Sequence, residues 1–361
     1  MSDPTRPLQV GLVGYGLAGS VFHAPLIAST PGLRLRSVVT SDPERRSQLA
    51  REHPDARAVG SVDELLADPA ELGLVVVASP NRSHVPVARA ALEAGLPVVV
   101  DKPLSATAAE ARDLAALAAD RGLLLTVFQN RRWDGDFRTV KQLIADGALG
   151  TVHRFESRFE RWRPALKGGW RESSDPVEAG GLLYDLGSHL VDQALDLFGP
   201  VETVYAETDA RRAGAAVDDD AFVALTHVSG VRSHLWMSAV AGQFGPRLRV
   251  LGDRGAYTVY GLDPQEAALR SGQRPGPGWG ATPESDWGLL GTPEDARRHP
   301  SLPGDYPAFY AAVAAALRGG APAPVTADEA VAALTVLEAA RRSAAEGRAV
   351  SLAPAEGTVA A

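Results

Sequence analysis

The sequence predicts two α/β domains. The first is a doubly wound parallel sheet, and the second is built on a large, mainly antiparallel, open-faced sheet. Up to residue 129, short apolar runs alternate with helix-like segments, as parallel strands joined by helical crossovers require. From residue 151 onward, alternating runs recur with turn signals such as Ser229-Gly230, which indicate hairpins. The length of 361 residues, 45% of them hydrophobic, suits two domains of ordinary size, which we place at residues 1–129 and 130–361.

Each element of the first domain has its own local signal. Residues 8–13 and 72–79 are nearly uninterrupted apolar runs, the pattern of strands buried on both faces. Residues 33–40 alternate and stop at Ser41-Asp42-Pro43, where proline suits the first turn of a helix. The remaining predictions for this domain are strands at 96–100 and 123–128 and helices at 84–94 and 105–121.

Strand signals dominate the second domain after a first helix at 136–144. Period-two alternation predicts strands at 151–161, 201–208, 219–228, 231–239, 247–251 and 255–260. Residues 178–199 read as one long helix. The Gly- and Pro-rich residues 264–303 predict a long irregular excursion, and helices at 306–318 and 327–346 close the chain.

A glycine motif follows the first strand. Gly14, Gly16 and Gly19 stand at G-x-G-x-x-G spacing before a helix-compatible run. The first glycine allows the tight turn, the second lets a pyrophosphate approach the backbone, and the third lets the helix pack closely on the strand. The helix N-terminus adds free N–H donors for phosphate. This context predicts a dinucleotide-binding Rossmann domain.

The end of the second strand bears on which dinucleotide is bound. An acidic residue there would hydrogen-bond the adenine ribose of NAD, but this chain has the neutral pair Thr40 and Ser41. Arg45, one turn further on, suits a 2′-phosphate. Asp42 and Glu44 argue for NAD. We therefore expect NADP, with NAD as the alternative.

Two further strand ends carry polar groups. Ser79-Pro80-Asn81 follows the strand at 72–79, where it can touch the nicotinamide half of a cofactor, although Asn81 or Ser83 could instead cap the next helix. His84 is either structural or orients the cofactor. Lys102, at the end of a buried strand, is our first candidate for proton transfer, the alternative being an exposed loop lysine. The cofactor contacts expected from this domain are Gly14, Tyr15, Gly16, Leu17, Ala18, Thr40, Ser41, Arg45, Ser79, Pro80, Asn81, His84, Asp101 and Lys102.

The segment 178–199 adds a second set of candidates. In a helix, Asp185, His189, Asp192 and Asp196 share one face. Asp185 could orient His189, and an imidazole can both accept and return a proton near neutral pH. A solvated acidic face and a metal site are the alternatives, but no further histidine stands at ligand spacing, so we expect no metal.

Composition excludes several classes of protein. The net charge is −8 and the basic residues are scattered, so we expect no nucleic-acid partner. Cysteine is absent, which excludes disulfides and thiolate-bound metal and fits a reducing compartment. Residues 1–7 lack the apolar core of a signal peptide, and no apolar run approaches the roughly 18 residues of a membrane span. We expect a cytoplasmic protein with no membrane partner.

Taken together, these motifs resemble those of the Gfo/Idh/MocA oxidoreductases. The residues that carry the resemblance are Gly14-x-Gly16-x-x-Gly19, Asp101-Lys102-Pro103, Gly180-Gly181 and Asp185-x-x-x-His189. The resemblance covers nearly the whole chain and implies that Lys102, Asp185 and His189 are catalytic. The family usually has glutamate where this chain has Asp101.

A longer set of segments looks like the NADP-dependent scyllo-inositol dehydrogenase branch of that family: Gly14 to Leu26, Asn130 to Asp134, Arg161 to Pro164 and Tyr184 to His189. This likeness implies hydride transfer between NADP and a ring hydroxyl of a cyclic polyol or sugar. It also implies that Asn130, Arg131 and Trp162 lie near the cofactor, and that homodimers or homotetramers form through the C-terminal sheet. The alternatives are an NAD(P)-dependent sugar or aldose dehydrogenase and a non-catalytic NADP-binding sensor.

Overall fold

The computed structural model describes residues 6–352. These form two compact units, and neither unit is continuous in sequence. Of the described residues, the first unit contains 6–135, 263–281 and 303–331, and the second contains 136–262, 282–302 and 332–352. The domain boundary at residues 129 and 130 stays a prediction.

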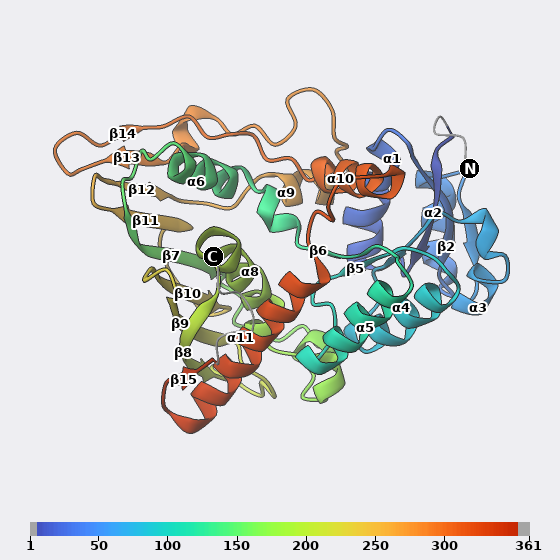
Figure 1. Cartoon of the computed structure of the whole chain (residues 1–361), viewed down its shortest axis with the longest axis horizontal. Helices are drawn as coiled ribbons and strands as arrows, with labels where there is room; N and C mark the ends of the chain where they lie inside the picture. Colours follow the sequence, from blue (N-terminus) through green and yellow to red (C-terminus); the bar gives the residue numbers. More distant parts are fainter. Residues whose placement is uncertain (1–5, 353–361) are drawn as a thin grey trace. The chain divides into compact units, whose positions relative to one another are not determined.

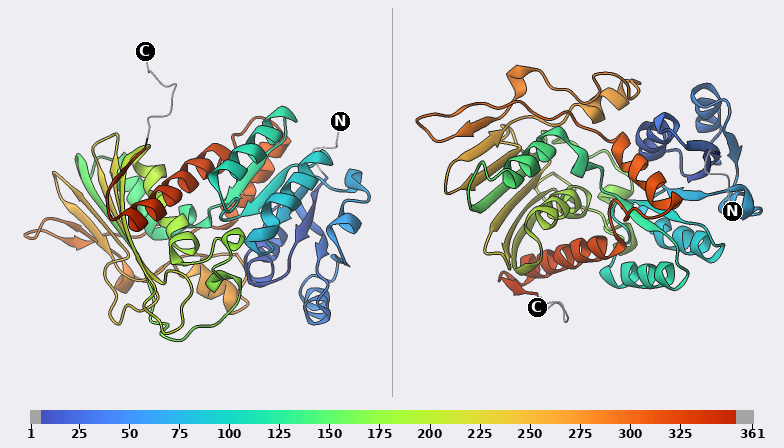
Figure 2. Two further views of the ribbon diagram at one scale, coloured as in Figure 1. Left: turned by 90° about the horizontal axis from the view of Figure 1, so that it is seen from below. Right: turned by 45° about the horizontal axis from the view of Figure 1, so that its top comes forward.

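The first unit is a parallel sheet with helices on it (Figures 1 and 2). Its six strands run in the order β3-β2-β1-β4-β5-β6, and every pairing is parallel. This order is that of Rossmann domains, as predicted. The strands are β1 (Leu8–Val13), β2 (Leu33–Val39), β3 (Arg57–Val59), β4 (Leu74–Val77), β5 (Val98–Asp101) and β6 (Leu125–Phe128). The helices are α1 (Ala24–Ser29), α2 (Pro43–Glu52), α3 (Val62–Leu65), α4 (His84–Glu93), α5 (Ala108–Asp120), α9 (Gln265–Arg270) and α10 (Pro307–Arg318).

The second unit is built on a nine-stranded mixed sheet of order β14-β13-β12-β11-β7-β10-β9-β8-β15. Among the strand pairs that the described residues form within this sheet, only the pairing of β7 with β10 is parallel, so the sheet is mainly antiparallel, as predicted. Its strands are β7 (Val152–Glu160), β8 (Val201–Asp209), β9 (Asp220–His227), β10 (Arg232–Ser238), β11 (Leu248–Gly252), β12 (Ala256–Val259), β13 (Leu289–Gly291), β14 (Arg297–Arg298) and β15 (Val350–Ser351).

Helices cover one face of this sheet. The helices of the second unit are α7 (Leu182–Asp185) and α8 (Gly187–Phe198), while α6 (Gly135–Ala145) and α11 (Ala327–Glu346) each cross a boundary between the units in sequence. Helix α8 packs on β7 and β10. Along β10, Leu235 and Met237 are fully buried, whereas the alternate residues His234 and Trp236 are half-buried on the other face. The open-faced sheet predicted from sequence is therefore present.

Two sequence-based expectations about elements are wrong. Residues 178–199 do not form one helix: α7 and α8 are separated at Leu186, and Gly181, with φ of 99°, lies outside the helical region before α7. Glycine also has low helix propensity at positions 180, 181 and 187. Residues 264–303 are not wholly irregular, because they contain α9 and the strands β13 and β14, which extend the sheet edge.

Candidate functional site

The glycine loop lies between β1 and α1, and a side chain would meet different surroundings at each of its three glycines. Gly14 has φ of 98°, and a Cβ there would lie 2.7 Å from the carbonyl oxygen of Ala78. A Cβ on Gly19 would collide with the carbonyl group of Gly14. Gly16 differs from both, because the nearest atom to its Cβ position is Arg45 Nη1 at 3.9 Å. The first and third glycines close the turn, and the second leaves open space beside the backbone.

This loop fits the pyrophosphate of a dinucleotide. The open side of Gly16 is the approach that a phosphate needs, and the guanidinium of Arg45 lies beside it. Leu17 is 43% exposed, so the loop is accessible there. Tyr15 is buried and its hydroxyl donates to Glu52 at 2.9 Å. The Tyr15 side chain is thus turned inward, and burial raises its pKa.

The end of β2 is organised by the N-cap of α2. The carboxylate of Asp42 accepts the backbone N–H groups of Glu44 and Arg45, at 2.9 and 3.3 Å. Arg45 Nε lies 3.4 Å from Asp42 Oδ2. Thr40 is buried and its carbonyl accepts Arg46 Nε at 2.9 Å, while Ser41 is exposed. Arg46 therefore holds the backbone of this turn, and Arg45 faces the glycine loop.

The turn after β4 is tied to the turn after β5 by His84. Its Nδ1 lies 2.7 Å from the carbonyl oxygen of Pro103 and its Nε2 lies 2.9 Å from that of Ser79. Burial lowers the pKa of His84 below its ordinary value, against the opposing effect of Asp101. Ser83 bonds Pro80 and Ser79 and makes no cap hydrogen bond to α4, so capping by Ser83 is wrong. Asn81 is buried beside this turn.

Lys102 stands where β5 ends, as the sequence indicates. Its backbone N–H donates to Asp101 Oδ1 at 2.9 Å, and Pro103 follows through a cis peptide bond. The side chain of Lys102 is neither fully buried nor fully exposed. The ends of β1, β2, β4 and β5 thus place the glycine loop, Asp42, Ser79 and Lys102 along one edge of a parallel sheet, where ligands of such sheets bind.

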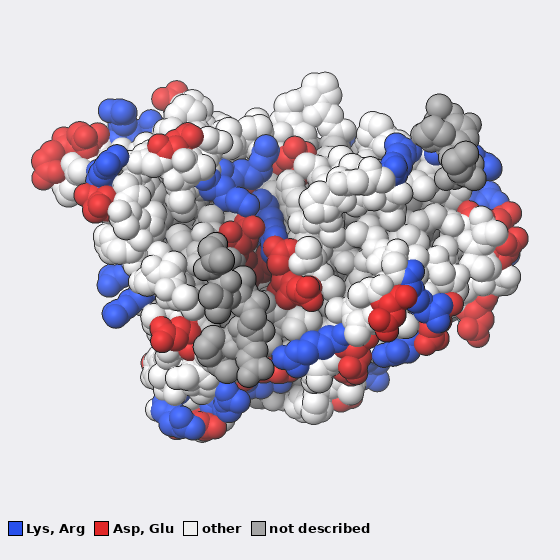
Figure 3. Space-filling model, in the orientation of Figure 1, with Lys and Arg blue, Asp and Glu red and all other residues white. Residues whose placement is uncertain are grey.

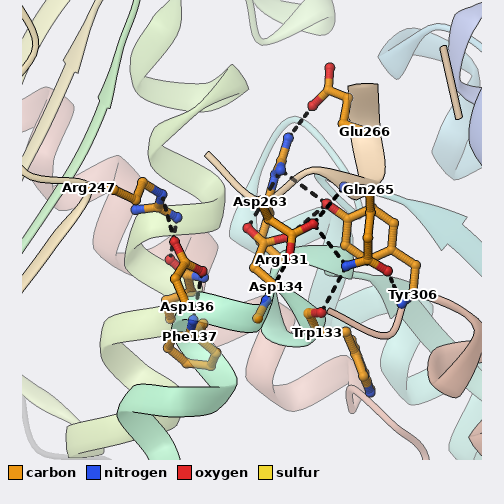
Figure 4. A network of polar contacts seen from close by, with 12 residues as sticks. Arg131, Trp133, Asp134, Asp136, Phe137, Arg247, Asp263, Gln265, Glu266 and Tyr306 are labelled. Atoms are coloured by element: carbon orange, nitrogen blue, oxygen red, sulfur yellow. Dashed lines mark hydrogen bonds and ion pairs between the residues drawn. The ribbon is translucent and has the colours of Figure 1, made fainter. Parts of the chain in front are cut away.

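Arg131 belongs to a buried polar cluster of the first unit (Figure 4). Its guanidinium donates to Tyr306 Oη at 3.0 Å, lies 3.5 Å from Asp134 and makes a short bond to Glu266. The hydroxyl of Tyr306 donates to Asp134 at 2.7 Å. Burial opposes the ionisation of Glu266, but Arg131 and Arg270 lower its pKa overall. Sequence reasoning missed Glu266 and Tyr306 because they lie more than a hundred positions from Arg131 in the chain. The neighbouring Asn130 is also buried.

The acidic stripe of α7 and α8 is not a solvated face. In the second unit, His189 is 6% exposed and Asp192 is 2% exposed. Asp185 Oδ1 lies 3.5 Å from Arg171 Nε, and Asp196 pairs with Lys141 at 2.9 Å. Trp162 is 59% exposed in the same unit. His189 and Asp192 are therefore buried, while Asp185 and Asp196 are each paired with a basic side chain.

Comparison with known proteins decides the family. The Gfo/Idh/MocA oxidoreductase model for the NAD-binding Rossmann fold matches residues 8–129, and the model for the C-terminal alpha/beta domain matches residues 141–352. The chain belongs to the Gfo/Idh/MocA oxidoreductase family. As a member of that family it is a dehydrogenase with an NAD(P)-binding Rossmann domain.

Relatives match along almost the entire chain. YdgJ of Escherichia coli K12, named an uncharacterized oxidoreductase, is 42% identical over 95% of this chain and 97% of its own. The scyllo-inositol 2-dehydrogenase (NADP(+)) IolW of Bacillus subtilis 168 is 37% identical over 96% of each. The solved structure of the Bacillus subtilis protein yvaA superposes with a TM-score of 0.92 at 36% identity, covering 98% of this chain and 100% of that one.

Neither a metal site nor a membrane span is found in the part of the chain that the structure describes. Between residues 6 and 352, no three His, Asp or Glu side chains are grouped so that they could hold a metal ion. No helix within the same residues is long and apolar enough to cross a membrane. On the face drawn in Figure 3, basic and acidic side chains are interspersed.

Two glycine variants test the fit of the loop. G16A should fold as the wild type does, because the Cβ meets only Arg45 Nη1 at an ordinary contact distance of 3.9 Å, but it should weaken NADP binding by at least about tenfold by filling the phosphate approach. G19A should instead lower stability by about 1–3 kcal/mol through overpacking. Calorimetric titration with NADP and thermal unfolding by circular dichroism measure the two effects. Wild-type affinity in G16A would contradict the assignment of the loop.

Proposed function

We propose that this dehydrogenase oxidises a ring hydroxyl of a cyclic polyol, with scyllo-inositol as the first candidate, and uses NADP. The observation that carries the proposal is the likeness to IolW, which spans 96% of the chain and is named for this reaction. Accordingly, the substrate assignment rests on the relative, and the cofactor assignment also rests on the loop and on Arg45.

Three residues of the chain are proposed to manage the proton. Oxidation of an alcohol removes a hydride from carbon and a proton from oxygen. When bound, the oxidised nicotinamide accepts the hydride. In this proposal His189 takes the hydroxyl proton, Asp185 orients the imidazole, and the ammonium of Lys102 donates a hydrogen bond to the substrate oxygen. The burial of His189 supports its role, since a buried imidazole exchanges protons with bound substrate rather than bulk water.

The preference for NADP rests on how Asp42 and Arg45 are engaged. The Asp42 carboxylate already accepts two backbone N–H groups of α2, so it is a poor partner for a ribose hydroxyl. Arg45 lies next to the glycine loop, where its guanidinium can bond a 2′-phosphate. NAD remains the alternative cofactor.

We also propose that the protein is cytoplasmic, because a chain without cysteine suits a reducing compartment.

Turnover on a set of sugars and polyols tests the function. Reduction of NADP and NAD is followed by absorbance with scyllo-inositol, myo-inositol, glucose and xylose. We expect the highest kcat/KM with scyllo-inositol and NADP, and a loss of at least about 100-fold in K102M and H189N with NADP affinity kept. Turnover of glucose or xylose alone would favour a sugar dehydrogenase. NADP binding without any turnover would favour a sensor.

Removal of the Arg45 guanidinium tests the cofactor assignment. R45A should raise the KM for NADP about tenfold, the effect of losing one charge-assisted bond to phosphate, and should leave the KM for NAD within about twofold. R51A is the matched control, because Arg51 lies in the last turn of the same helix. Initial rates with both cofactors decide the outcome, and an equal loss with NADP and NAD in R45A would contradict the proposed 2′-phosphate contact.

The open face of the C-terminal sheet is proposed to join copies of the chain into homodimers or homotetramers. On that face the rings of Phe222 and Trp236 are in tilted contact with centroids 5.1 Å apart, and the guanidinium of Arg158 lies 3.9 Å over Trp236. These side chains are only half-buried within one chain. Half-buried aromatic residues with arginine are typical of the core of a protein interface.

Light scattering after size-exclusion chromatography tests this surface. The wild type should have a mass that is two or four times 37.9 kDa, and W236E should shift toward the mass of one chain because it places a charge among these aromatic rings. V228E is the control, since Val228 is 67% exposed outside the strands. A monomeric wild type, or an unchanged mass for W236E, would refute the proposed interface.

A further inference from the structure

His23 is a fully buried histidine to which the proposed reaction assigns no part. It ends the π-helical segment Ala18–His23 of the first unit. Its ring packs against Phe128, with centroids 4.4 Å apart, and meets the edge of Tyr310 at 6.1 Å. Because a buried imidazole loses its hydration, its two nitrogens need partners inside the protein.

The two ring nitrogens of His23 have different surroundings. Nδ1 lies 2.5 Å from Tyr310 Oη. Nε2 has no hydrogen-bond partner among residues 6–352, and lies 3.9 Å from Asp101 Oδ1. Burial raises the pKa of Tyr310 well above its ordinary value, so its hydroxyl stays protonated and can donate to Nδ1. When Tyr310 donates to Nδ1, the ring proton is on Nε2, which lies on the side of Asp101.

Asp101 connects His23 with Lys102. Its carboxylate is 17% exposed, and it accepts the backbone N–H of Lys102 at 2.9 Å. The ionisable groups that act on it are His23, Lys102 and His84, and Tyr310 lies behind His23. Burial disfavours the carboxylate, but His23, Lys102 and His84 more than offset it and lower the pKa of Asp101.

We propose that His23 is a positioning residue: the hydroxyl of Tyr310 fixes its ring so that Nε2–H faces the Asp101 carboxylate across 3.9 Å, and this electrostatic contact keeps Asp101 aimed at the Lys102 backbone. Asp101 in turn fixes the backbone of Lys102, the first residue after β5. The inference rests on the proposed function only in that Lys102 is taken to donate a hydrogen bond to the substrate oxygen. The arrangement of His23, Tyr310 and Asp101 lies wholly within the first unit.

Two amide variants of His23 distinguish the contribution of Nδ1 from that of Nε2. In H23N the side-chain amide reaches the position of Nδ1 and keeps a partner for Tyr310, but the donor toward Asp101 is lost. In H23Q the amide reaches the position of Nε2 and keeps that donor. We expect H23N to lower kcat about tenfold with KM and NADP affinity within about twofold, and H23Q to restore most of the activity.

The pH dependence provides a readout that a purely structural role would not move. Without the Nε2 donor, the pKa of Asp101 should rise, so the acid limb of kcat/KM should move to higher pH by about one unit in H23N but not in H23Q. The sign follows from Asp101, whose pKa is lowered in the folded protein and whose charge is lost as pH falls. Y310F, which frees Nδ1, should give a smaller displacement in the same direction.

A second readout needs no substrate. The chain has three lysines, Lys102, Lys141 and Lys167, so reductive methylation with ¹³C-formaldehyde labels few sites. The Lys102 methyl signal should move as Asp101 titrates, at higher pH in H23N than in the wild type, and this step should vanish in D101N. Lys141 is the internal control, because its partner is Asp196.

The outcomes are distinct. Displacement of the Lys102 signal in H23N, with H23Q resembling the wild type, supports the inference even if no tested polyol is a substrate. A lower thermal midpoint in H23N with an unchanged Lys102 titration, or equal displacement in H23N and H23Q, overturns it. If scyllo-inositol is not oxidised by the wild type while the Lys102 titration behaves as expected, the substrate proposal fails alone.

Discussion

The close approach of Gly19 to the carbonyl group of Gly14 is the constraint on which the first unit depends. No side chain fits at position 19, so the segment Ala18–His23 lies directly against the end of β1. The same approach has two consequences. It leaves the backbone at Gly16 open beside Arg45, and it carries His23 into the interior, where the ring reaches Phe128 and Asp101. A cofactor loop and a buried imidazole thus follow from one steric requirement.

Two largely buried charged side chains of the first unit, Arg131 and Asp101, are compensated by nearby polar or charged groups. Burying a carboxylate or a guanidinium costs roughly several kcal/mol unless an opposite charge or hydrogen bonds replace the lost hydration. Arg131 has Tyr306, Asp134 and Glu266, and Asp101 has the Lys102 backbone and His23. Such pairs add little net stability, but they hold geometry, since removing one member leaves the other charged and buried. Their concentration in the Rossmann unit fits a region whose polar groups must be fixed in place.

Local sequence signals predicted what is local. The glycine spacing, the apolar runs of β1 and β4 and the alternation of β9 and β10 are set by neighbours in the chain, and the structure confirms these elements. The break at Leu186 was missed because apolar periodicity continues through it, while Ala179 and Gly181, both with positive φ, prevent an earlier helical start. The pairing of His23 with Tyr310 joins residues 287 positions apart, and no periodicity encodes it. For the same reason, the spacing that predicted one helix face for Asp185 and His189 could show neither the break between them at Leu186 nor the burial of His189.

Asp42 shows why residue type alone gave an ambiguous cofactor prediction. A carboxylate three residues beyond β2 is close enough in sequence to resemble the acidic residue that binds the ribose of NAD. Its function depends on what already satisfies its oxygens. Asp42 Oδ1 accepts two N–H groups that would otherwise lack partners at the start of α2, and Oδ2 faces Arg45. Turning the Asp42 carboxylate toward a ribose would break its hydrogen bonds to the N-terminus of α2, a loss of roughly 1 kcal/mol. It would also remove the carboxylate that faces the guanidinium of Arg45. A phosphate placed near Arg45 requires neither loss, so the capped Asp42 and the adjacent Arg45 together support the proposal that the cofactor is NADP.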